Sequence, residues 1–467
     1  MTDFPLTIDG QSVSGEGTFG VVNPATGAVF AQAPACSRAQ LDAAMEAAHR
    51  AFGPWARDEA RRREALRACA EAVKARLGEL APILTREQGK PLARAREELL
   101  GAAVWFSYTA GLETPVEVLQ DDDRVRIEVR RRPHGVVGAI TPWNFPVLLG
   151  VWKIAPALLA GNTVVIKPSP FTPLSTLKLG EVLRDALPPG VLNVVAGGDE
   201  LGAWVSSHPR VRKISFTGSV ATGRKVAAAA APDLKRYTLE LGGNDAAIVL
   251  EADPGRIAEK LFWGAFANSG QVCSAIKRLY VHERIAAPLV EALAAVARGV
   301  KVGDGMQPDV QLGPVNNRPQ FERVVELIDD AKRAGAQVVT GGGARAGQGY
   351  FVEPTLVTGV AEGVRLVDEE QFGPALPILT YRDVDEAVAR ANGTPYGLSG
   401  SVWSADPARA AEVAGRLECG TAWVNQHLAI VPHAPFGGAK WSGVGVENGP
   451  WGLLGFTELQ TVHIAKQ

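Results

Sequence analysis

Residues 136–146 read VVGAITPWNFP, an apolar run that ends in a turn closed by two prolines, and a helix-like apolar segment follows at 147–159. The run at 136–140 is apolar throughout, which is typical of a strand buried on both faces. Strand-like and helix-like segments go on alternating up to residue 250. The next predicted strands are residues 163–166, 192–195 and 213–217. This alternation predicts an α/β fold with a parallel sheet, whose ligands bind beyond the carboxyl ends of the strands.

A second alternating series runs over residues 241–436. Its predicted strands are residues 246–250, 279–282, 337–340 and 378–381. A chain of 467 residues exceeds the size at which one hydrophobic core keeps growing, so we expect two or three domains. Upstream, residues 38–52 and 57–80 have helical spacing, and Gly53-Pro54 should break the helix between them.

A different pattern precedes the first buried strand. Val125, Ile127 and Val129 alternate with charged side chains, and this period of two predicts a half-exposed strand. We therefore expect the segment at 116–132 to project from the main body. The tail at 455–467 alternates weakly and is suited to adding a strand to a partner.

The composition is that of an ordinary globular protein, with 46% hydrophobic and 21% charged residues. A formal net charge of −2 gives no electrostatic reason to expect binding to nucleic acid or to an anionic membrane. The start of the chain lacks a signal-peptide pattern, and the longest apolar stretch, 147–161, contains Lys153 and is too short to span a bilayer. Four cysteines without paired or metal-ligand spacing favour reduced thiols in a cytoplasmic protein without a metal site.

Three side chains offer covalent chemistry on a carbonyl carbon. Cys273, in the run NSGQVCS at 268–274, has small neighbours that allow close approach, and a deprotonated thiol is a strong nucleophile. Glu240 ends a strand-like run and precedes two glycines, so its carboxylate is suited to activating water against a thioester. Asn144 lies between two prolines that fix the backbone, and its amide is suited to donating to a developing oxyanion.

Each of these residues also has an ordinary structural interpretation. A single cysteine is more often a buried core residue, as the Ala-rich surroundings of Cys36 and Cys69 illustrate. A lone glutamate is more often a surface or ion-paired group, and an asparagine more often closes a turn or caps a helix.

Two further segments indicate a nucleotide. The run FTGSVATG at 216–223 follows a predicted strand and opens a helix, where free N–H groups can hold a pyrophosphate. Its glycine spacing differs from the general dinucleotide fingerprint, so this motif is weak by itself. Lys167 stands at the carboxyl end of a predicted strand, where it could bond ribose hydroxyls, although an exposed lysine is the simpler interpretation.

In order along the chain, these pieces resemble the aldehyde dehydrogenase superfamily, and in particular its NAD(P)-dependent, non-acylating members. The motifs that carry the resemblance are 142–146 (PWNFP), 167–169 (KPS), 216–219 (FTGS), 240–243 (ELGG), 270–273 (GQVC), 369–374 (EEQFGP) and 435–443 (PFGGAKWSG). The match runs from about residue 20 to the end. Seven ordered motifs make it specific and outweigh the single-residue alternatives.

The resemblance implies a subunit in three parts. A Rossmann-like nucleotide-binding domain would comprise residues 1–115 and 133–240, and an α/β catalytic domain residues 241–438. Residues 116–132 and 439–467 would form a small β oligomerisation element and give a homodimer or homotetramer.

The resemblance also implies the reaction, which is oxidation of an aldehyde to a carboxylic acid. Cys273 would attack the aldehyde carbon to give a thiohemiacetal, whose oxyanion the Asn144 side chain and the Cys273 backbone N–H would hold. Hydride transfer to NAD(P) would leave a thioester, and Glu240 would activate the water that hydrolyses it. Lys153 and Glu447 match positions proposed to relay protons from this base.

The residues that would hold the cofactor also follow from the resemblance. They are Trp143, Lys167, Ser169, Gly218, Ser219, Glu370 and Phe372. Pro170 stands where many NAD-preferring members have a glutamate that repels a 2′-phosphate, so we expect NAD and consider NADP possible. Val446 precedes Glu447 where an arginine is common, which leaves the arrangement of the proton relay open.

The family pattern further implies a substrate tunnel. Its lining would be Phe145, Leu148, Trp152, Val272, Ser274, Ile430 and Phe436. This lining is aromatic and apolar, with no evident cation for a carboxylated semialdehyde, which favours a hydrophobic or aromatic aldehyde. His427 and His433 lie in the loop before Phe436 and either contact substrate or are ordinary loop histidines.

Two other functions are weighed against this one. A CoA-acylating semialdehyde dehydrogenase would use CoA in place of water, but such relatives usually lack the general base that Glu240 provides. A non-catalytic binding protein on the same scaffold would be expected to have lost Cys273, Glu240 or Asn144, and all three are present.

Overall fold

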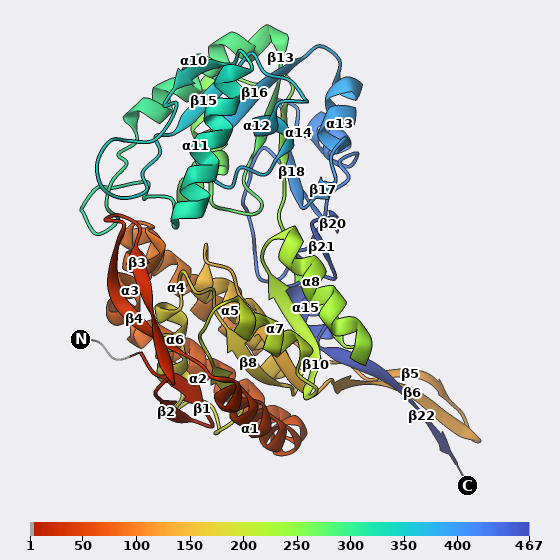
Figure 1. Cartoon of the computed structure of the whole chain (residues 1–467). Helices are drawn as coiled ribbons and strands as arrows, with labels where there is room; N and C mark the ends of the chain where they lie inside the picture. Colours follow the sequence, from red (N-terminus) through yellow and green to blue (C-terminus); the bar gives the residue numbers. More distant parts are fainter. Residues whose placement is uncertain (1–3, 467) are drawn as a thin grey trace.

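The computed structural model describes residues 4–466 and contains two large sheets, with a narrow arm that projects from one side (Figure 1). The first sheet has eight strands in the order β2-β1-β9-β8-β7-β10-β11-β21. Its strands are β1 (Leu6–Ile8), β2 (Gln11–Val13), β7 (Val136–Ile140), β8 (Thr163–Lys167), β9 (Leu192–Val194), β10 (Val211–Thr217), β11 (Arg236–Glu240) and β21 (Gly443–Val444). The five strands from β9 to β11 run parallel, as the alternation predicted.

The second sheet lies above the first in Figure 1 and has the order β14-β15-β16-β13-β12-β18-β19. Its strands are β12 (Ala246–Val249), β13 (Arg278–His282), β14 (Gln337–Thr340), β15 (Thr355–Thr358), β16 (Ala375–Tyr381), β18 (Ser399–Trp403) and β19 (Thr421–Val424). All pairs except β14–β15 are parallel. Ala247 and Val249 pack into one core and Ala246 and Ile248 into another, because successive residues of a strand face opposite sides. The predicted α/β fold class is therefore confirmed.

Helices cover both sheets. Around the first sheet lie α1 (Arg38–Arg57), α2 (Glu59–Ala75), α3 (Leu77–Gln88), α4 (Leu92–Thr109), α5 (Pro146–Leu159), α6 (Leu174–Leu183), α7 (Asp199–Ser207) and α8 (Val220–Ala230). Around the second lie α9 (Pro254–Phe266), α10 (Glu283–Gly299), α11 (Arg318–Arg333), α12 (Arg365–Asp368), α13 (Val384–Asn392) and α14 (Pro407–Ala414), and α15 (Gly449–Leu454) precedes the tail. No helix within residues 4–466 is both long enough and apolar enough to cross a membrane.

The expected helix break at Gly53-Pro54 is wrong. The helix α1 continues through Pro54 to Arg57, and the break comes at Asp58, which caps α2 by accepting from the Arg61 N–H (2.9 Å). The buried Trp55 donates from its indole to the Leu158 carbonyl (3.1 Å), and this tertiary bond holds the last turn of α1 against α5. A tertiary contact thus outweighs the local penalty of proline in a helix.

The arm is a separate sheet in the order β22-β6-β5, made of β5 (Glu117–Asp121), β6 (Val125–Pro133) and β22 (Thr457–Ala465) (Figure 1). The segment at 116–132 projects from the main body, as expected. The tail strand β22 pairs along nine residues with β6 of its own chain. A separate antiparallel pair, β3 (Gly17–Asn23) and β4 (Ala28–Ala35), precedes α1.

The arrangement brings several chain segments to one place between the two sheets. The turn after β7, which contains Asn144, and the ends of β10 and β11 lie at the carboxyl edge of the first sheet. Thr217 and Glu240 are directly paired there. The loop before β13, which contains Cys273, reaches this edge from the second sheet.

Candidate active site

The loop that carries Cys273 has an unusual backbone. Asn268, Ser269 and Gly270 have φ values of +50°, +57° and +73°. A left-handed conformation costs a non-glycine residue roughly 1–2 kcal/mol, and it persists only where surrounding contacts impose it. The contacts of this loop must therefore impose this backbone conformation on it.

Two contacts fix the loop before the cysteine. Ser269 Oγ donates to the Gly313 carbonyl (2.8 Å). Gly270 packs so closely that a Cβ would lie 2.2 Å from the Gly373 carbonyl oxygen, so only glycine fits. The loop is clamped between two other loops of the same half of the subunit, and Cys273 follows at a fixed position.

The Cys273 thiol lines a cavity of about 520 Å³, named here the inner cavity. Burial raises the pKa of Cys273 to about 12, the Lys277 ammonium opposes this shift and Glu240 adds to it. Lys277 Nζ also donates to the Cys273 carbonyl (3.0 Å). Burial raises the pKa of Cys69 to about 12 as well, so the position of Cys273 and not its acidity sets it apart. A thiol of this kind needs a base to take its proton.

Asn144 reaches the inner cavity from the turn between β7 and α5. Its side chain is buried, and Nδ2 donates to the Gln271 carbonyl (3.0 Å), two residues before the thiol. An amide nitrogen carries two N–H donors. One is committed to the cysteine loop, and the structure gives the other no acceptor within residues 4–466. Asn144 can therefore donate to a group bound beside Cys273.

Glu240 is buried at the end of β11, and its Oε1 has no partner in the described part of the chain. Burial raises the pKa of Glu240 well above its usual value, the Glu447 carboxylate adds to the shift and the Lys153 ammonium opposes it. A buried carboxyl with a raised pKa can accept a proton near neutral pH.

A buried polar chain lies beside this carboxyl. Lys153 Nζ donates to Thr217 Oγ1 and to Glu447 Oε1, both at 2.6 Å. Thr217 is the strand partner of Glu240. The structure thus brings together the two residues, Lys153 and Glu447, that the sequence analysis assigned to a proton relay, although they come from α5 and the C-terminal region.

The inner cavity contains five of the seven predicted cofactor residues. They are Trp143, Gly218, Ser219, Glu370 and Phe372. Trp143 and Phe372 meet edge to face with ring centroids 5.1 Å apart. Ser219 caps α8 by accepting from the Thr222 N–H (3.2 Å). Helix starts leave further N–H groups free, and those of Val220 and Ala221 lie in the cavity wall.

Glu370 is held at the other side of the inner cavity. Its Oε1 accepts from the Gly243 N–H (3.0 Å). At Gly242 a Cβ would lie 2.1 Å from Glu370 Oε2, so a glycine is required for the carboxylate to take this position. Burial raises the pKa of Glu370 and Lys277 opposes the shift.

Sequence reasoning missed part of the inner cavity. Arg224, Gln320, Arg323, Tyr396 and Trp441 also line it. The Arg224 guanidinium lies 4.4 Å from the centre of the Trp441 ring. Trp441 lies in the motif at 435–443 but was not assigned a role. No sequence signal marks the other four, because α8, α11 and the short strand β17 (Tyr396–Gly397) supply them and only the tertiary fold brings these elements together.

Lys167 and Ser169 lie outside the lining of the inner cavity. Lys167 ends β8, which is two strands away from β10 in the sheet. Burial lowers the pKa of Lys167 to about 8, and the Asp199 carboxylate at the start of α7 opposes the shift. These residues mark a second polar position along the same edge of the first sheet.

Most of the predicted tunnel residues form one apolar cluster. Trp152 stacks on Trp105 (centroids 5.6 Å apart) and meets Phe436 edge-on (5.7 Å). Phe145, Leu148, Ile430 and Cys273 itself pack against this cluster. Val272 and Ser274 flank the cysteine and are buried, and neither is a member of this apolar cluster. Trp105, which comes from α4, was missed by the sequence analysis.

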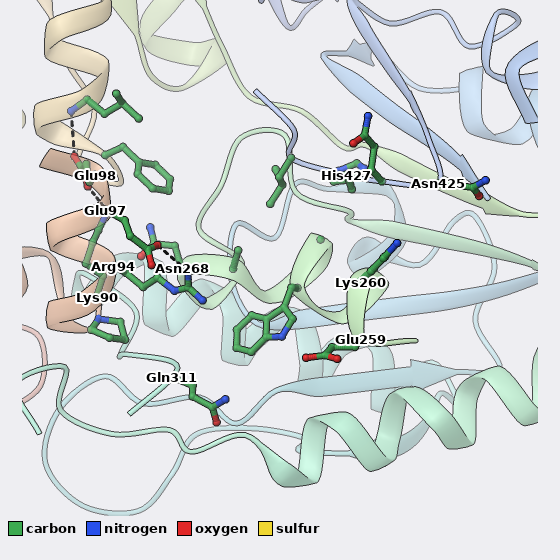
Figure 2. Close-up of a pocket in the computed structure, with 18 residues that line it drawn as sticks. Lys90, Arg94, Glu97, Glu98, Glu259, Lys260, Asn268, Gln311, Asn425 and His427 are labelled. Carbon is green, nitrogen blue, oxygen red and sulfur yellow. Dashed lines mark hydrogen bonds and ion pairs between the residues drawn. The ribbon is translucent and has the colours of Figure 1, made fainter. Parts of the chain in front are cut away.

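The cluster adjoins a wider cavity of about 840 Å³, the outer cavity, drawn in Figure 2. Phe145 and Leu148 belong to both. The remaining wall carries charged side chains, namely Lys90, Arg94, Glu97, Glu98, Glu259 and Lys260. The sequence indicated no cation near the tunnel, because α4, α9 and the segment between α3 and α4 supply these charges from distant parts of the chain. Lys90 is paired with Glu98 and Arg94 with Glu97.

The two histidines differ in their surroundings. His427 Nε2 donates to the Ser274 carbonyl (2.7 Å), so Nδ1 accepts from Ser401 Oγ (3.0 Å). Burial lowers the pKa of His427 to about 3, which keeps the ring neutral. His427 lines the outer cavity with both ring nitrogens already bonded. His433 stands near the Tyr108 ring, with centroids 6.5 Å apart.

Comparisons with known proteins agree with this geometry. The model of the aldehyde dehydrogenase family matches residues 12–462. A probable aldehyde dehydrogenase from Pseudomonas sp. is 42% identical, over 99% of this chain and 95% of that protein. The retinaldehyde dehydrogenase 3 of Homo sapiens is 40% identical, over 97% of this chain and 91% of that protein.

A solved structure has the same fold. The NAD⁺ complex of an aldehyde dehydrogenase from Bacillus cereus superposes with a TM-score of 0.97 at 36% sequence identity, and the match covers 100% of this chain and 97% of that one. The family model, the relatives and the shared fold agree over nearly the whole chain. The chain belongs to the aldehyde dehydrogenase family and is an oxidoreductase that acts on aldehydes.

Proposed function

We propose that this enzyme oxidises an aldehyde to a carboxylic acid with NAD(P), through a thioester on Cys273. The observation that carries the proposal is the meeting of a thiol, an amide donor and a buried carboxyl between the two sheets. Cys273 and Asn144 line the same cavity, and Glu240 is close enough to Cys273 to raise its pKa.

The first step is addition of sulfur to the carbonyl carbon. The Cys273 sulfur forms the new C–S bond, and the thiol proton passes to Glu240, whose pKa burial raises, so that it holds a proton more readily than an exposed carboxyl. The carbonyl oxygen becomes an oxyanion, which the free Asn144 N–H and the Cys273 backbone N–H stabilise. The product is a thiohemiacetal on Cys273.

The inner cavity suits a dinucleotide. The start of α8 offers N–H groups for a pyrophosphate, Glu370 offers a carboxylate for ribose hydroxyls, and Trp143 and Phe372 form an aromatic corner of the wall. We assign Lys167 and Ser169 to the second ribose. The NAD⁺ complex of the Bacillus cereus relative supports a nicotinamide dinucleotide as the cofactor. A bound nicotinamide would supply the hydride acceptor that turns the thiohemiacetal into a thioester.

The last step is hydrolysis of the thioester. The chain Thr217–Lys153–Glu447 lies beside Glu240 and first passes the thiol proton onward. The freed Glu240 carboxylate then takes a proton from water, and the resulting hydroxide attacks the thioester carbon. The C–S bond breaks to release the acid and the Cys273 thiolate, which takes that proton back from Glu240.

For the substrate, we favour a hydrophobic or aromatic aldehyde. The cluster around Cys273 is built from Trp105, Trp152, Phe436 and Ile430, and the cations of Lys90 and Arg94 are each paired with a glutamate. A free carboxylate would find the cations of Lys90 and Arg94 already neutralised. The retinaldehyde dehydrogenase among the relatives is compatible with an apolar substrate.

We also propose that the arm forms subunit contacts in a homodimer or homotetramer. Leu119 and Leu459 on its strands are 63% and 61% exposed, and Val116, Val118 and Ile464 are exposed on the same arm. Apolar side chains that gather on a surface mark an interaction site. A second copy of the chain would cover them.

The nucleophile and the base are separated by one pair of variants. Cys273→Ala should abolish aldehyde-dependent NAD(P)H formation, because no other thiol lines the inner cavity. Glu240→Gln should slow the first turnover, in which Glu240 takes the thiol proton, and should lose about 10²–10³-fold in steady state, as expected for a general base. Stopped-flow absorbance measures both, with the surface variant Glu71→Gln as control. An unchanged steady state in Glu240→Gln would contradict the base assignment.

The raised pKa of Glu240 predicts a pH dependence. Glu240 acts as a base only when deprotonated, so the steady-state rate should fall as the pH drops through its raised pKa. Glu447→Gln removes a charge that raises this pKa and leaves Lys153, which lowers it. The acidic limb of the pH–kcat profile should therefore move to lower pH. A limb that stays in place or moves to higher pH would exclude this coupling.

The apolar cluster predicts a trend with substrate size. Each methylene buried there should add about 0.8 kcal/mol, or about fourfold in kcat/KM, from acetaldehyde to hexanal. Benzaldehyde should exceed succinic semialdehyde, and Ile430→Ala should flatten the aliphatic series. A panel of these aldehydes, with betaine aldehyde included, tests the assignment. If the enzyme prefers succinic semialdehyde or betaine aldehyde, the assignment of an apolar substrate is wrong and the substrate is a charged aldehyde.

The proline at position 170 predicts tolerance of NADP. Pro170→Glu should lower kcat/KM for NADP relative to NAD by about tenfold, since a carboxylate near a 2′-phosphate repels it. Pro170→Gln is the matched neutral control and should leave the ratio near that of the parent. Equal ratios in the parent, Pro170→Gln and Pro170→Glu would mean that position 170 lies away from the adenosine ribose.

A further inference from the structure

A fully buried ion pair lies beneath the turn that carries Asn144. Lys90 follows the end of α3, and Glu98 lies in α4. Their side chains are each 1% exposed, and Lys90 Nζ is bonded to Glu98 Oε2. Burying two charges is unfavourable unless further polar contacts satisfy them. The other contacts of this pair therefore indicate why it is there.

Both members of the pair bond to the same turn. Lys90 Nζ donates to the backbone carbonyl of Asn144 (2.9 Å). Glu98 Oε1 accepts from the N–H groups of Val147 (3.0 Å) and Leu148 (3.2 Å). The pair thus holds the turn at its centre and at its end, and the lysine and the glutamate are drawn next to each other in Figure 2.

The start of α5 depends on this glutamate. Phe145 occupies the N-cap position and provides no side-chain hydrogen bond to the helix. The first N–H groups of a helix need acceptors, and a carboxylate there is favoured by the helix dipole. Glu98 supplies that acceptor from another helix, and Lys90 balances its charge. The two prolines restrict the backbone conformation of the turn, and the ion pair sets the position of the turn in the fold.

The lysine also contacts the substrate side of the turn. Lys90 Nζ lies 3.9 Å from the centre of the Phe145 ring, a cation–π contact. With Glu98, the Asn144 carbonyl and this ring as partners, the ammonium is fully occupied. Lys90 is therefore placed to orient neighbouring groups and not to bind substrate.

The same carbonyl joins the turn to the cysteine loop. Asn268 Nδ2 donates to the Asn144 carbonyl (3.2 Å), and Asn144 Nδ2 donates to the Gln271 carbonyl (3.0 Å). Lys90 is the second donor on that carbonyl. A shift of the turn would therefore move the Asn144 amide relative to Cys273.

We infer that the buried Lys90–Glu98 ion pair is a positioning device for the Asn144 amide, setting its direction toward the oxyanion formed at Cys273. This inference rests on the proposed function, in which Asn144 holds that oxyanion. Lys90 and Glu98 act through the turn and touch no reacting atom.

The test is a double-mutant cycle between the pair and Asn144. Lys90→Met with Glu98→Gln replaces both charges by neutral side chains of similar length, and the new amide oxygen can still accept from α5. Asn144→Ala removes the donor itself. Lys74→Met with Glu71→Gln, an exposed pair on α2, is the matched control. The measured quantity is the single-turnover rate of NAD(P)H formation, with the parent enzyme alongside.

A positioning role predicts losses that do not multiply. The pair variant should lose about 10–100-fold and Asn144→Ala about 10²–10³-fold. The combined variant should be no slower than Asn144→Ala within about threefold, because residues that act through one group are not additive. The KM for NAD(P) and the rate of Cys273 alkylation by iodoacetamide should stay within about twofold of the parent in the pair variant.

Other outcomes overturn the inference. If the rate losses of the pair variant and of Asn144→Ala multiply in the combined variant, the pair only supports the fold. The same holds if the pair variant is as fast as the parent. If the pair variant does not fold, Lys90→Arg replaces it, since arginine keeps the charge but directs its N–H groups differently. The decrease in single-turnover rate that Lys90→Arg causes must likewise be absent when Asn144→Ala is also present. A parent enzyme that forms no NAD(P)H with any aldehyde would instead refute the proposed function, and the inference with it.

Discussion

The hydrogen bond from the Asn144 amide to the Gln271 carbonyl joins the two halves of the subunit at the place where the chemistry occurs. One end belongs to the turn after a strand of the first sheet, and the other to the loop before a strand of the second. Each end is fixed by its own half. The Lys90–Glu98 pair holds the turn, and the close packing of Gly270 on Gly373 holds the loop. The thiol and the amide meet because neither segment can move independently.

Buried charge is the second theme of this site. Most of it is compensated: Lys90 by Glu98, and Lys153 by Glu447. Glu240 differs, because its buried Oε1 has no partner in the described residues and its pKa is raised. A carboxyl of that kind is unfavourable for stability, and groups with perturbed pKa values concentrate at functional sites. The protein thus leaves Glu240 without an ion-pair partner among the described residues, whereas Glu98 and Glu447 each have one.

Strands of the two main sheets were predictable, because apolar runs between turn residues report burial on both faces. The strand at Val136–Ile140 was predicted with its observed bounds. Helix ends were less predictable. The break expected at Gly53-Pro54 is absent since the Trp55 indole bonds to α5, a contact that local sequence does not reveal. The pairing of β22 with β6 of the same chain likewise could not be predicted, because it depends on where the tertiary fold positions the tail.

The sequence by itself determined which side chains were candidates for chemistry, because Cys273, Glu240 and Asn144 each sit in a motif whose residue types and order identify the family. Only the tertiary structure decided how these groups are held. Lys90 and Glu98 carry no motif that marked them, and the charges of the outer cavity come from α4, α9 and the segment between α3 and α4. The physical reason is that motifs record local backbone requirements. The environment of a buried charge, and hence its pKa and its partners, is set by segments that lie far apart in the sequence.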